Sequence, residues 1–217
     1  MSCECQRPDH EPRLVVLTGG PGAGKTAVLE VVRRSLCRHV KVLPEAAGIL
    51  FSGGFPRHHT LPGHRAAQRA IFQVQRQLEW LAIEEHDAAL ILCDRGCVDG
   101  FAYWPPPREE FWAEMGTTHA AELARYAAVI HLRTPASGNG YDHSNPLRIE
   151  SAEEAAAIDQ LIASLWAPHP RRREVASTAH FPAKLAEAIA LIRAEVPGCC
   201  LPSAGALTGP RRSAAGW

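Results

Sequence analysis

The sequence predicts an α/β fold in which helices cover both faces of a five-stranded parallel sheet. Short apolar runs alternate with stretches of helical periodicity along most of the chain, as strands and crossover helices do in a parallel sheet. A glycine-rich segment, LTGGPGAGKTA (residues 17–27), stands between the first apolar run and the first helical stretch. The 217 residues suffice for one domain with a sizeable core. These observations predict three layers and a loop of special conformation after the first strand.

The expected strands are short apolar segments bounded by turn-forming residues. RLVVLT and AALILC do not alternate apolar with polar residues, which indicates strands that are buried on both faces. The five expected strands are Arg13–Thr18, Val40–Pro44, Ala88–Cys93, Ala127–Leu132 and, with a weaker pattern, Glu174–Thr178. Because helical segments separate them, we expect right-handed parallel crossovers.

The expected helices follow from apolar residues at helical spacing. The longest spans Arg65 to about His86 and carries apolar residues at 3-4-3 spacing, which predicts a stripe facing the core. This stripe consists of Ile71, Val74, Leu78 and Leu81. Ser151 and Glu154 form the pattern of a capping box at the start of a helix over residues 151–167. Two more helices are expected over residues 24–38 and 182–196.

The two ends of the chain lack either periodicity. We expect residues 1–11 and 197–217 to be disordered, which leaves one domain over residues 12–196. Two long internal segments, residues 52–64 and 133–148, are rich in Gly, Pro, Ser or Asn and are expected to be loops. Loops of this length inside a compact domain are usually functional.

Composition excludes several classes of partner. Lys plus Arg and Asp plus Glu both number 23, so no bulk basic field favours nucleic acid or an anionic membrane. No apolar run approaches the ~20 residues of a membrane-spanning helix, and the polar start lacks the apolar region of a signal peptide. We therefore expect a cytoplasmic protein without nucleic-acid or membrane partners. The sequence contains no signal for its oligomeric state.

The seven cysteines do not predict a structural metal site. Cys93 and Cys97 lack a second pair at the spacing of zinc sites. Two further pairs fall in the ends that are expected to be disordered: Cys3 with Cys5, and Cys199 with Cys200. Three histidines of a proline-punctuated loop are expected to be solvated: His58, His59 and His64. We expect reduced thiols and no structural metal ion.

The residues from Gly19 to Thr26 have the spacing of a phosphate-binding P-loop, GxxxxGKT. Its glycines let successive backbone N–H groups point into one concavity, and the following helix adds the positive end of its dipole. Lys25 is expected to reach the β- and γ-phosphates of a nucleotide, and the Thr26 hydroxyl to ligate Mg²⁺. The expected nucleotide-binding residues are Gly19, Gly20, Pro21, Gly22, Ala23, Gly24, Lys25 and Thr26.

An acidic residue at the end of a neighbouring strand would complete such a site. Asp94 directly follows the third expected strand, where its carboxylate could bind Mg²⁺ directly or through water. The alternative role for Asp94 is an N-cap of the next short helix. The pairing of Thr26 and Asp94 favours the metal role.

Other classes of P-loop protein lack support in the sequence. No Asn-Lys-x-Asp motif is present to read guanine, as a Ras-like GTPase would require. FSGGF (residues 51–55) is similar to the signature of ABC transporter ATPases but stands too close to the P-loop, in too short a chain. A ring-forming AAA+ motor needs a helical lid domain for which there is little room. The remaining fold is a three-layer, nucleotide-kinase-like P-loop NTPase domain.

Several segments together resemble a known family. VVLTGGPGAGKTAVLE, VLPEAAGIL, CDRGCVDGFAYW and the segment around Arg148 are similar to the small AAA-type P-loop domains related to the nicotinamide riboside kinase domain of the bacterial NAD regulator. The same family includes a eukaryotic GTP-binding trafficking protein. The resemblance covers roughly Leu14–Glu195 and implies an ATP-binding, kinase-like domain.

Further residues are expected on the acceptor side of the site. Asp94 and Arg95 resemble the Asp-Arg motif of thymidylate-kinase-like enzymes, which implies that Arg95 holds the acceptor. Glu45 ends the second strand and should face the same cleft, because ligands bind at the carboxyl ends of parallel strands. We expect Glu45 or Asp94 to orient the acceptor hydroxyl or to act as its base. Asp99 and Tyr103 are expected to line the acceptor pocket.

The segment from residue 134 to 150 is in the right place for a lid. Its Arg148 is expected to stabilise charge on the transferring phosphoryl group, together with Lys25 and with Mg²⁺ on Thr26. The expected catalytic residues are therefore Lys25, Glu45, Asp94 and Arg148.

Two functions remain open from the sequence. The first is a Mg²⁺-dependent ATP phosphotransferase acting on a small hydroxyl- or phosphate-bearing metabolite, such as a nucleoside or nucleotide. The second is an ATP- or GTP-binding switch module without an acceptor, whose loops a partner reads. A nucleic-acid-linked ATPase is disfavoured by the neutral charge. Without a guanine motif, ATP should compete at least as well as GTP, with adenine against the backbone near residues 177–180.

Overall fold

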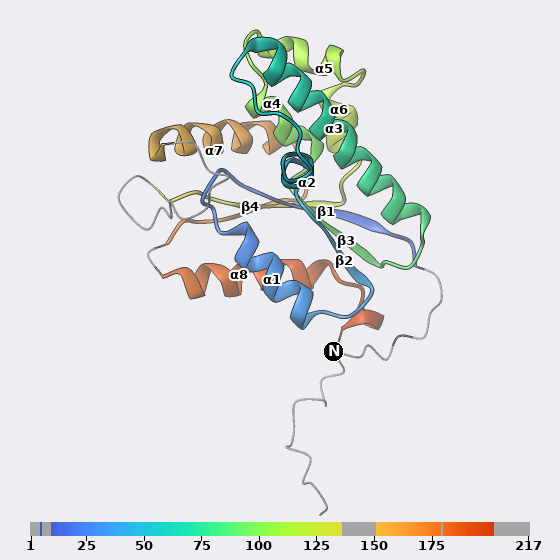
Figure 1. The fold of residues 1–217 in the computed structure, drawn as a ribbon. Helices are drawn as coiled ribbons and strands as arrows, with labels where there is room; N and C mark the ends of the chain where they lie inside the picture. Colours follow the sequence, from blue (N-terminus) through green and yellow to red (C-terminus); the bar gives the residue numbers. More distant parts are fainter. Residues whose placement is uncertain (1–4, 6–9, 136–150, 179, 202–217) are drawn as a thin grey trace, which may run out of the picture.

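The computed structural model describes residues 5, 10–135, 151–178 and 180–201 of the chain. They form a parallel sheet of five strands in the order β2-β3-β1-β4-β5, with helices on both faces (Figure 1). The strands are β1 (Arg13–Thr18), β2 (Val40–Leu43), β3 (Leu90–Asp94), β4 (Ala128–Leu132) and β5 (Arg172–Val175). The predicted five-stranded parallel sheet is confirmed, with β5 beginning two residues before its expected start at Glu174.

The central strand β1 pairs with β3 on one side and with β4 on the other. Its residues from Leu14 to Thr18 are all buried, as the continuous apolar run predicts for a strand with helices on both faces. The strands at either edge of the sheet lie nearer solvent, and β2 buries only Leu43 fully. The loop that follows β1 therefore starts from the most rigid part of the sheet.

One face of the sheet is covered by α1 (Lys25–Ser35) and α8 (Phe181–Glu195), and the other by α3 (Leu61–Glu84) and α7 (Ala152–Trp166) (Figure 1). Each face has its own cluster of buried apolar side chains. The predicted capping box at the start of α7 is confirmed, since Ser151 and Glu154 bond reciprocally to each other's backbone. No helix in the described part of the chain is long and apolar enough to cross a membrane.

Short helices fill the connections. They are α2 (Ala46–Ser52), η1 (Cys97–Asp99), α4 (Gly100–Tyr103), η2 (Arg108–Glu110), α5 (Phe111–Glu114), α6 (His119–Ala124) and η3 (Gly198–Cys200). Trp104 and Phe111 pack with Phe72 of α3 in a third buried cluster, which holds the segment between α4 and α6 against that helix. These aromatic residues explain why a proline-rich stretch remains ordered.

The prediction for α3 was wrong in two respects. The helix begins at Leu61, because Thr60 caps it by accepting from the Gly63 amide and Pro62 fits its first turn. The buried face is also rotated from the expected stripe: Leu81 is 50% exposed, while Glu79 is fully buried. The buried side chains of α3 are Ala67, Phe72, Gln75, Glu79 and Ala82. Glu79 is stabilised there by hydrogen bonds from Arg125 and from the Tyr126 hydroxyl.

The described parts of the two chain ends differ from the expected disorder. Cys5 and Cys200 are 7% and 2% exposed, and both belong to the apolar cluster under α1 and α8. Residues 198–200 form η3, which the absence of periodicity did not predict. Residues 1–4, 6–9 and 202–217 lie outside the described residues, as do residues 136–150 of the expected lid.

Candidate functional site

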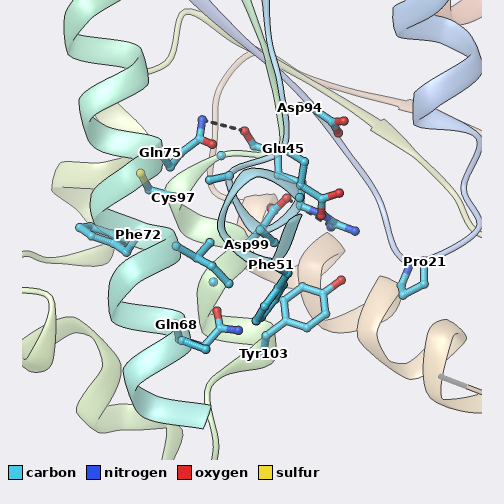
Figure 2. A pocket seen from close by; sticks show the side chains of 18 of the residues that line it. Pro21, Glu45, Phe51, Gln68, Phe72, Gln75, Asp94, Cys97, Asp99 and Tyr103 are labelled. Carbon is cyan, nitrogen blue, oxygen red and sulfur yellow. Dashed lines mark hydrogen bonds and ion pairs between the residues drawn. The ribbon is translucent and has the colours of Figure 1, made fainter. Parts of the chain in front are cut away.

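A cavity of about 440 Å³ opens at the carboxyl ends of β1, β2 and β3. Its wall is made by the P-loop, by α2 and the first turns of α3, and by the turn from β3 into η1 and α4. In Figure 2, Asp94 and Glu45 lie toward the top of the view, whereas Gln68 and Tyr103 lie at the bottom. One continuous cavity thus joins the phosphate-binding loop to a recess between α2, α3 and α4.

The P-loop has backbone conformations that require glycine. Gly19 has a φ of 139°, and a Cβ there would lie 2.1 Å from the Leu132 carbonyl oxygen. Gly24 has a φ of 93° and is the N-cap of α1. A side chain at either position would strain the loop or displace β4. The glycines expected to shape a phosphate cradle therefore have a conformational role.

Side chains from outside the loop hold its backbone. The Gly20 amide donates to Asp159 Oδ1 (2.9 Å), Thr134 Oγ1 donates to the Pro21 carbonyl (3.2 Å), and Lys184 Nζ donates to the Ala23 carbonyl (2.9 Å). None of these three contacts was predicted from the sequence. The available signal was a polar residue on the buried face of a helix, since Asp159 and Lys184 lie on α7 and α8 and are both buried. The P-loop is held in shape from both faces of the sheet.

Lys25 is buried beside the loop that it closes. Its ammonium donates to the carbonyl oxygens of Gly19 (3.1 Å) and Gly20 (3.4 Å). Burial, followed by the neighbouring Arg95 charge, lowers the pKa of Lys25 to about 8. A bound anion would stabilise this charge, as expected of a phosphate-binding lysine.

Asp94 has the features of a metal ligand. Its carboxylate oxygen Oδ1 is buried and has no hydrogen-bond partner among the described residues. Burial raises the pKa of Asp94 to about 6, although the Lys25 charge opposes that effect. The exposed Thr26 contributes a hydroxyl to the same cavity. Hydroxyl and carboxylate oxygens are ligands that Mg²⁺ prefers, so the residues present fit this ion.

Arg95 connects three parts of the site. Its Nε donates to Glu45 Oε1 (2.7 Å) and its Nη1 to the Gly19 carbonyl (3.0 Å), while its guanidinium lies over the Tyr103 ring. Its backbone has a φ of 72°, a conformation that non-glycine residues rarely adopt. Burial would raise the pKa of Glu45, but the charges of Arg95 and Lys25 keep it below its ordinary value. Glu45 therefore meets the cavity as an anion paired with Arg95.

Asp99 belongs to the cavity wall, but its carboxylate binds the protein itself. Oδ2 accepts from Thr18 Oγ1 and Oδ1 from Trp166 Nε1, each over 2.6 Å, and the residue is 2% exposed. These contacts link η1 to β1 and α7. Asp99 thus lies in the cavity wall while its carboxylate anchors η1, and its part in an acceptor pocket stays a prediction.

The recess away from the P-loop has apolar and amide side chains. Phe51 and Tyr103 contribute rings, and Gln68 and Gln75 of α3 contribute amides (Figure 2). Phe51 was not predicted to line the site, since it was considered only as part of FSGGF. The two glutamines were not predicted either, although they share one face of α3 at i and i+7. Three histidines expected to be solvated, His58, His59 and His64, are exposed and lie in the cavity wall.

Two expected contributors are not part of this cavity as described. Arg148 lies outside the described residues. Ser177, Thr178 and His180, the expected neighbours of adenine, are exposed and are not among the residues of the cavity wall. The next residue, Phe181, is 43% exposed, and its ring would contact a Cβ at Gly24, so it lies beside the P-loop.

The glycine-rich loop, the buried lysine and the carboxylate after β3 define the region to compare with known proteins. Residues 14–183 match the family described as AAA domain. The chain belongs to this AAA domain family. The resemblance found in the sequence is thereby confirmed. No curated protein matches the sequence.

Solved structures with the same fold as this AAA domain are remote in sequence. NadR in complex with NR has a TM-score of 0.62 and 12% identity, over 86% of this chain and 52% of that one. NadR in complex with NAD and AMP-PNP has a TM-score of 0.55 and 11% identity, over 85% of this chain and 49% of that one. Thymidylate kinase from Candida albicans has a TM-score of 0.55 and 14% identity, over 85% of this chain and 94% of that one. The chain spans about half the length of the NadR chains. The shared fold is the P-loop nucleotide-kinase-like fold, a nucleotide-binding architecture.

The AAA domain can therefore place two kinds of ligand in one space. At one end, Lys25 and the P-loop amides suit phosphate, and Asp94 suits a metal ion. Arg95 and Glu45 offer paired charges beside this phosphate end, since Arg95 and Lys25 both donate to the Gly19 carbonyl. The recess beyond them offers aromatic rings and amides. One cavity thus joins the phosphate end to the recess.

Proposed function

We propose that this protein is a Mg²⁺-dependent phosphotransferase that moves the γ-phosphoryl group of ATP to a small acceptor of the nucleoside or nucleotide class. The observation that carries the proposal is the single cavity in which Lys25 and Asp94, with the Arg95–Glu45 pair beside them, adjoin a recess lined by Phe51, Gln68 and Tyr103. A protein that only sensed a nucleotide would need no walled recess beyond the phosphates.

The phosphate end is organised by residues that meet developing negative charge. Lys25 and the P-loop amides would bind the β- and γ-phosphates. Thr26 and Asp94 would hold Mg²⁺, which neutralises phosphate charge when it is bound. Because the loop is already held by Asp159 and Lys184, little reorganisation would accompany binding. Arg148 remains a predicted contributor to the stabilisation of the transferred group.

The acceptor end suits a planar ring with a polar edge. Phe51 and Tyr103 present aromatic faces, and the Gln68 amide can donate to and accept from a ring edge. Arg95 would hold acceptor oxygens, and Glu45 or Asp94 would orient the attacking hydroxyl. The structures of similar fold support an acceptor of this class. Two are NadR, solved with NR or with NAD and AMP-PNP, and the third is a thymidylate kinase.

The nucleotide base would lie on the outer side of the P-loop. Phe181 presents a half-exposed ring beside Gly24, and an aromatic ring can stack on any nucleotide base. The backbone near residues 177–180 remains the predicted reader of adenine. Since stacking does not discriminate and no guanine motif is present, ATP is expected to compete at least as well as GTP.

An acceptor screen tests the proposal. ADP release from Mg·ATP is measured with nucleosides, nucleotides and sugar metabolites, and phosphorylated products are identified by mass spectrometry. We expect one nucleoside or nucleotide class to raise turnover above the basal rate. Gln68→Ala should then raise the acceptor KM, while Gln73→Ala, which alters an exposed residue of the same helix, should not.

The same screen can contradict the proposal. If no acceptor raises ADP release while Mg·ATP still binds, the nucleotide-binding switch becomes the better reading. A clear preference for GTP in a competition titration would point the same way.

A further inference from the structure

A second group of reactive side chains lies at the end of the sheet opposite to the nucleotide cavity. His39 directly precedes β2, whereas the cavity opens where β2 ends. Cys200 of η3 lies against His39, and Cys5 and His10 of the N-terminal segment join them. Figure 1 shows the red segment of η3 near the end of α1 and the start of β2. Neither the proposed phosphotransfer nor the P-loop uses these four residues.

The four ligand atoms are arranged as they would be around one ion. One sulfur or ring nitrogen from each of Cys5, His10, His39 and Cys200 lies within 4.8 Å of the other three. Sγ of Cys5 lies 3.6 Å from Nε2 of His10, and Sγ of Cys200 lies 3.4 Å from Nδ1 of His39 and 3.9 Å from Nε2 of His10. Tetrahedral zinc, with bonds of about 2.3 Å to sulfur and 2.0 Å to nitrogen, places such atoms roughly 3.6 Å apart. These three contact distances are therefore close to the edge length of a zinc tetrahedron.

A buried cluster of ligands and ion is most stable when it carries no net charge. Cys5, His39 and Cys200 are buried, and His10 is partly buried. On binding, Zn²⁺ replaces the two thiol protons, which leave to solvent, and two thiolates then balance its charge. The loaded cluster is neutral and suits its apolar surroundings.

The backbone holds the ligands in place from three distant segments. The His39 carbonyl accepts from the amides of Ala89 (2.8 Å) and Leu90 (3.1 Å), which ties it to the start of β3. The His10 amide donates to the His86 carbonyl (3.3 Å), and the Cys200 amide donates to the Pro197 carbonyl (2.8 Å). The N-terminal segment and η3 thus meet beside the start of β2, as segments that share a structural metal site do.

We propose that Cys5, His10, His39 and Cys200 bind one Zn²⁺ ion that joins the two ends of the folded chain to the sheet. A closed set of two thiolates and two imidazoles leaves no position open for a substrate, so the role is structural. The part of the chain that matches the AAA domain family, residues 14–183, contains only His39 of the four ligands. The site is thus built largely from this protein's own flanking segments. It differs from the expectation, drawn from cysteine spacing alone, that no structural metal ion is bound.

Metal content of the reduced full-length protein, purified without chelators, tests the proposal. We expect one zinc ion per chain in the parent and in Cys199→Ser, which alters an exposed cysteine adjacent to the site. Cys200→Ser should lose the zinc. Cobalt added to the metal-free parent should give the visible d–d bands of a tetrahedral ion and a sulfur-to-cobalt charge-transfer band. Removal of zinc should lower Tm, and added zinc should restore it.

Two further variants keep the test independent of folding. His10→Ala alters a partly exposed ligand and Cys5→Ser a ligand near the chain end, so both should keep the far-UV spectrum of the parent. Each should weaken zinc binding and change the cobalt spectrum. Mg·ATP binding should remain in all four variants, which separates this proposal from the proposed phosphotransfer.

Three results would overturn the proposal. The first is a parent chain that contains no zinc and shows no tetrahedral cobalt spectrum. The second is a Cys5–Cys200 disulfide in the protein purified under reducing conditions. The third is zinc content that His10→Ala, Cys5→Ser and Cys200→Ser all leave unchanged.

Discussion

The amide of Gly20 donates a hydrogen bond to Asp159 Oδ1 across 2.9 Å, which ties the P-loop directly to α7. The same carboxylate accepts from His131 Nε2 (2.9 Å) and pairs with Arg133 Nε (3.1 Å). A Cβ at Gly20 would lie 2.7 Å from the Asp159 Cβ, so no side chain fits between the two residues. The loop expected to hold phosphate is therefore positioned by a residue that does not contact the cavity.

Loss of the Asp159 carboxylate should affect both stability and binding. Asp159→Ala leaves the Gly20 amide, His131 and Arg133 without their shared acceptor, so we expect a loss of about 2–4 kcal/mol in the free energy of unfolding. Mg·ATP binding should weaken as well, because the loop is no longer held. Urea unfolding and calorimetric titration measure the two effects. Gln160→Ala, an exposed neighbour on α7, should change stability by less than about 0.5 kcal/mol.

The ionised Asp94 carboxylate should lower the free energy of unfolding in the absence of ligands. Its folded pKa of about 6 lies above the ordinary 3.8, so the folded state holds the proton more tightly and stability falls as pH rises from 3.8 through 6. Asp94→Asn should therefore be more stable than the parent at pH 7, by up to about 3 kcal/mol, with no difference near pH 3. Thermal unfolding across pH measures this. The surface variant Glu109→Gln should follow the parent curve at every pH, and an Asp94→Asn curve that does likewise would contradict the prediction.

Lys25 should show the opposite dependence. Its pKa is lowered from 10.5 to about 8, so the folded state favours the neutral amine and stability is lost as pH falls from 10.5 through 8. Lys25→Met should raise the unfolding free energy at pH 7 by about 1–3 kcal/mol while abolishing tight Mg·ATP binding. Lys41→Met, on the protein surface, should leave nucleotide binding unchanged. Retained binding in Lys25→Met would show that the loop does not hold phosphate as proposed.

Arg95 and Arg148 should differ in their kinetic effects. Arg148→Ala is expected to lower kcat by about 10²-fold with a smaller effect on ATP affinity, because the charge acts on the transferring phosphoryl group. Arg95→Ala should chiefly raise the acceptor KM, with some loss of kcat, since the guanidinium fork suits acceptor oxygens. Steady-state kinetics with the acceptor found by screening distinguishes the two patterns. Arg108→Ala alters an exposed arginine and should match the parent. If Arg95→Ala changes neither constant, the acceptor role of Arg95 fails.

Phe181 should contribute to nucleotide affinity without selecting the base. Phe181→Ala removes a stacking surface beside Gly24, and we expect a loss of about 1–2 kcal/mol in the binding of both ATP and GTP. Leu61→Ala, which alters a comparably exposed apolar residue, should have no effect. Titration with a fluorescent nucleotide compares the variants. Equal affinities in Phe181→Ala and the parent would place the base elsewhere.

Local patterns in the sequence were enough for the sheet and for the loop. Continuous apolar runs predicted β1, β3 and β4, because a strand buried on both faces needs an apolar residue at nearly every position. The edge strand β5 is not such a run, and its weaker pattern matched only Glu174 and Val175 of the observed strand. The glycines at 19 and 24 and the Ser151–Glu154 pair act through backbone conformation within a few residues. Such features depend on neighbours in the chain, so they can be recognised before the fold is known.

Contacts between distant residues were decided only by the tertiary structure. Glu79 is buried because Arg125 and Tyr126 meet it from across the fold, so hydrophobic periodicity alone placed the buried face of α3 slightly out of position. Asp159 approaches Gly20 only because α7 packs above the P-loop. Cys5 and His10 meet Cys200 and His39 only because the N-terminal segment and η3 converge at the amino end of the sheet. In each case a polar group becomes buried by the packing of remote segments, and its partner is chosen by that packing and not by spacing along the chain.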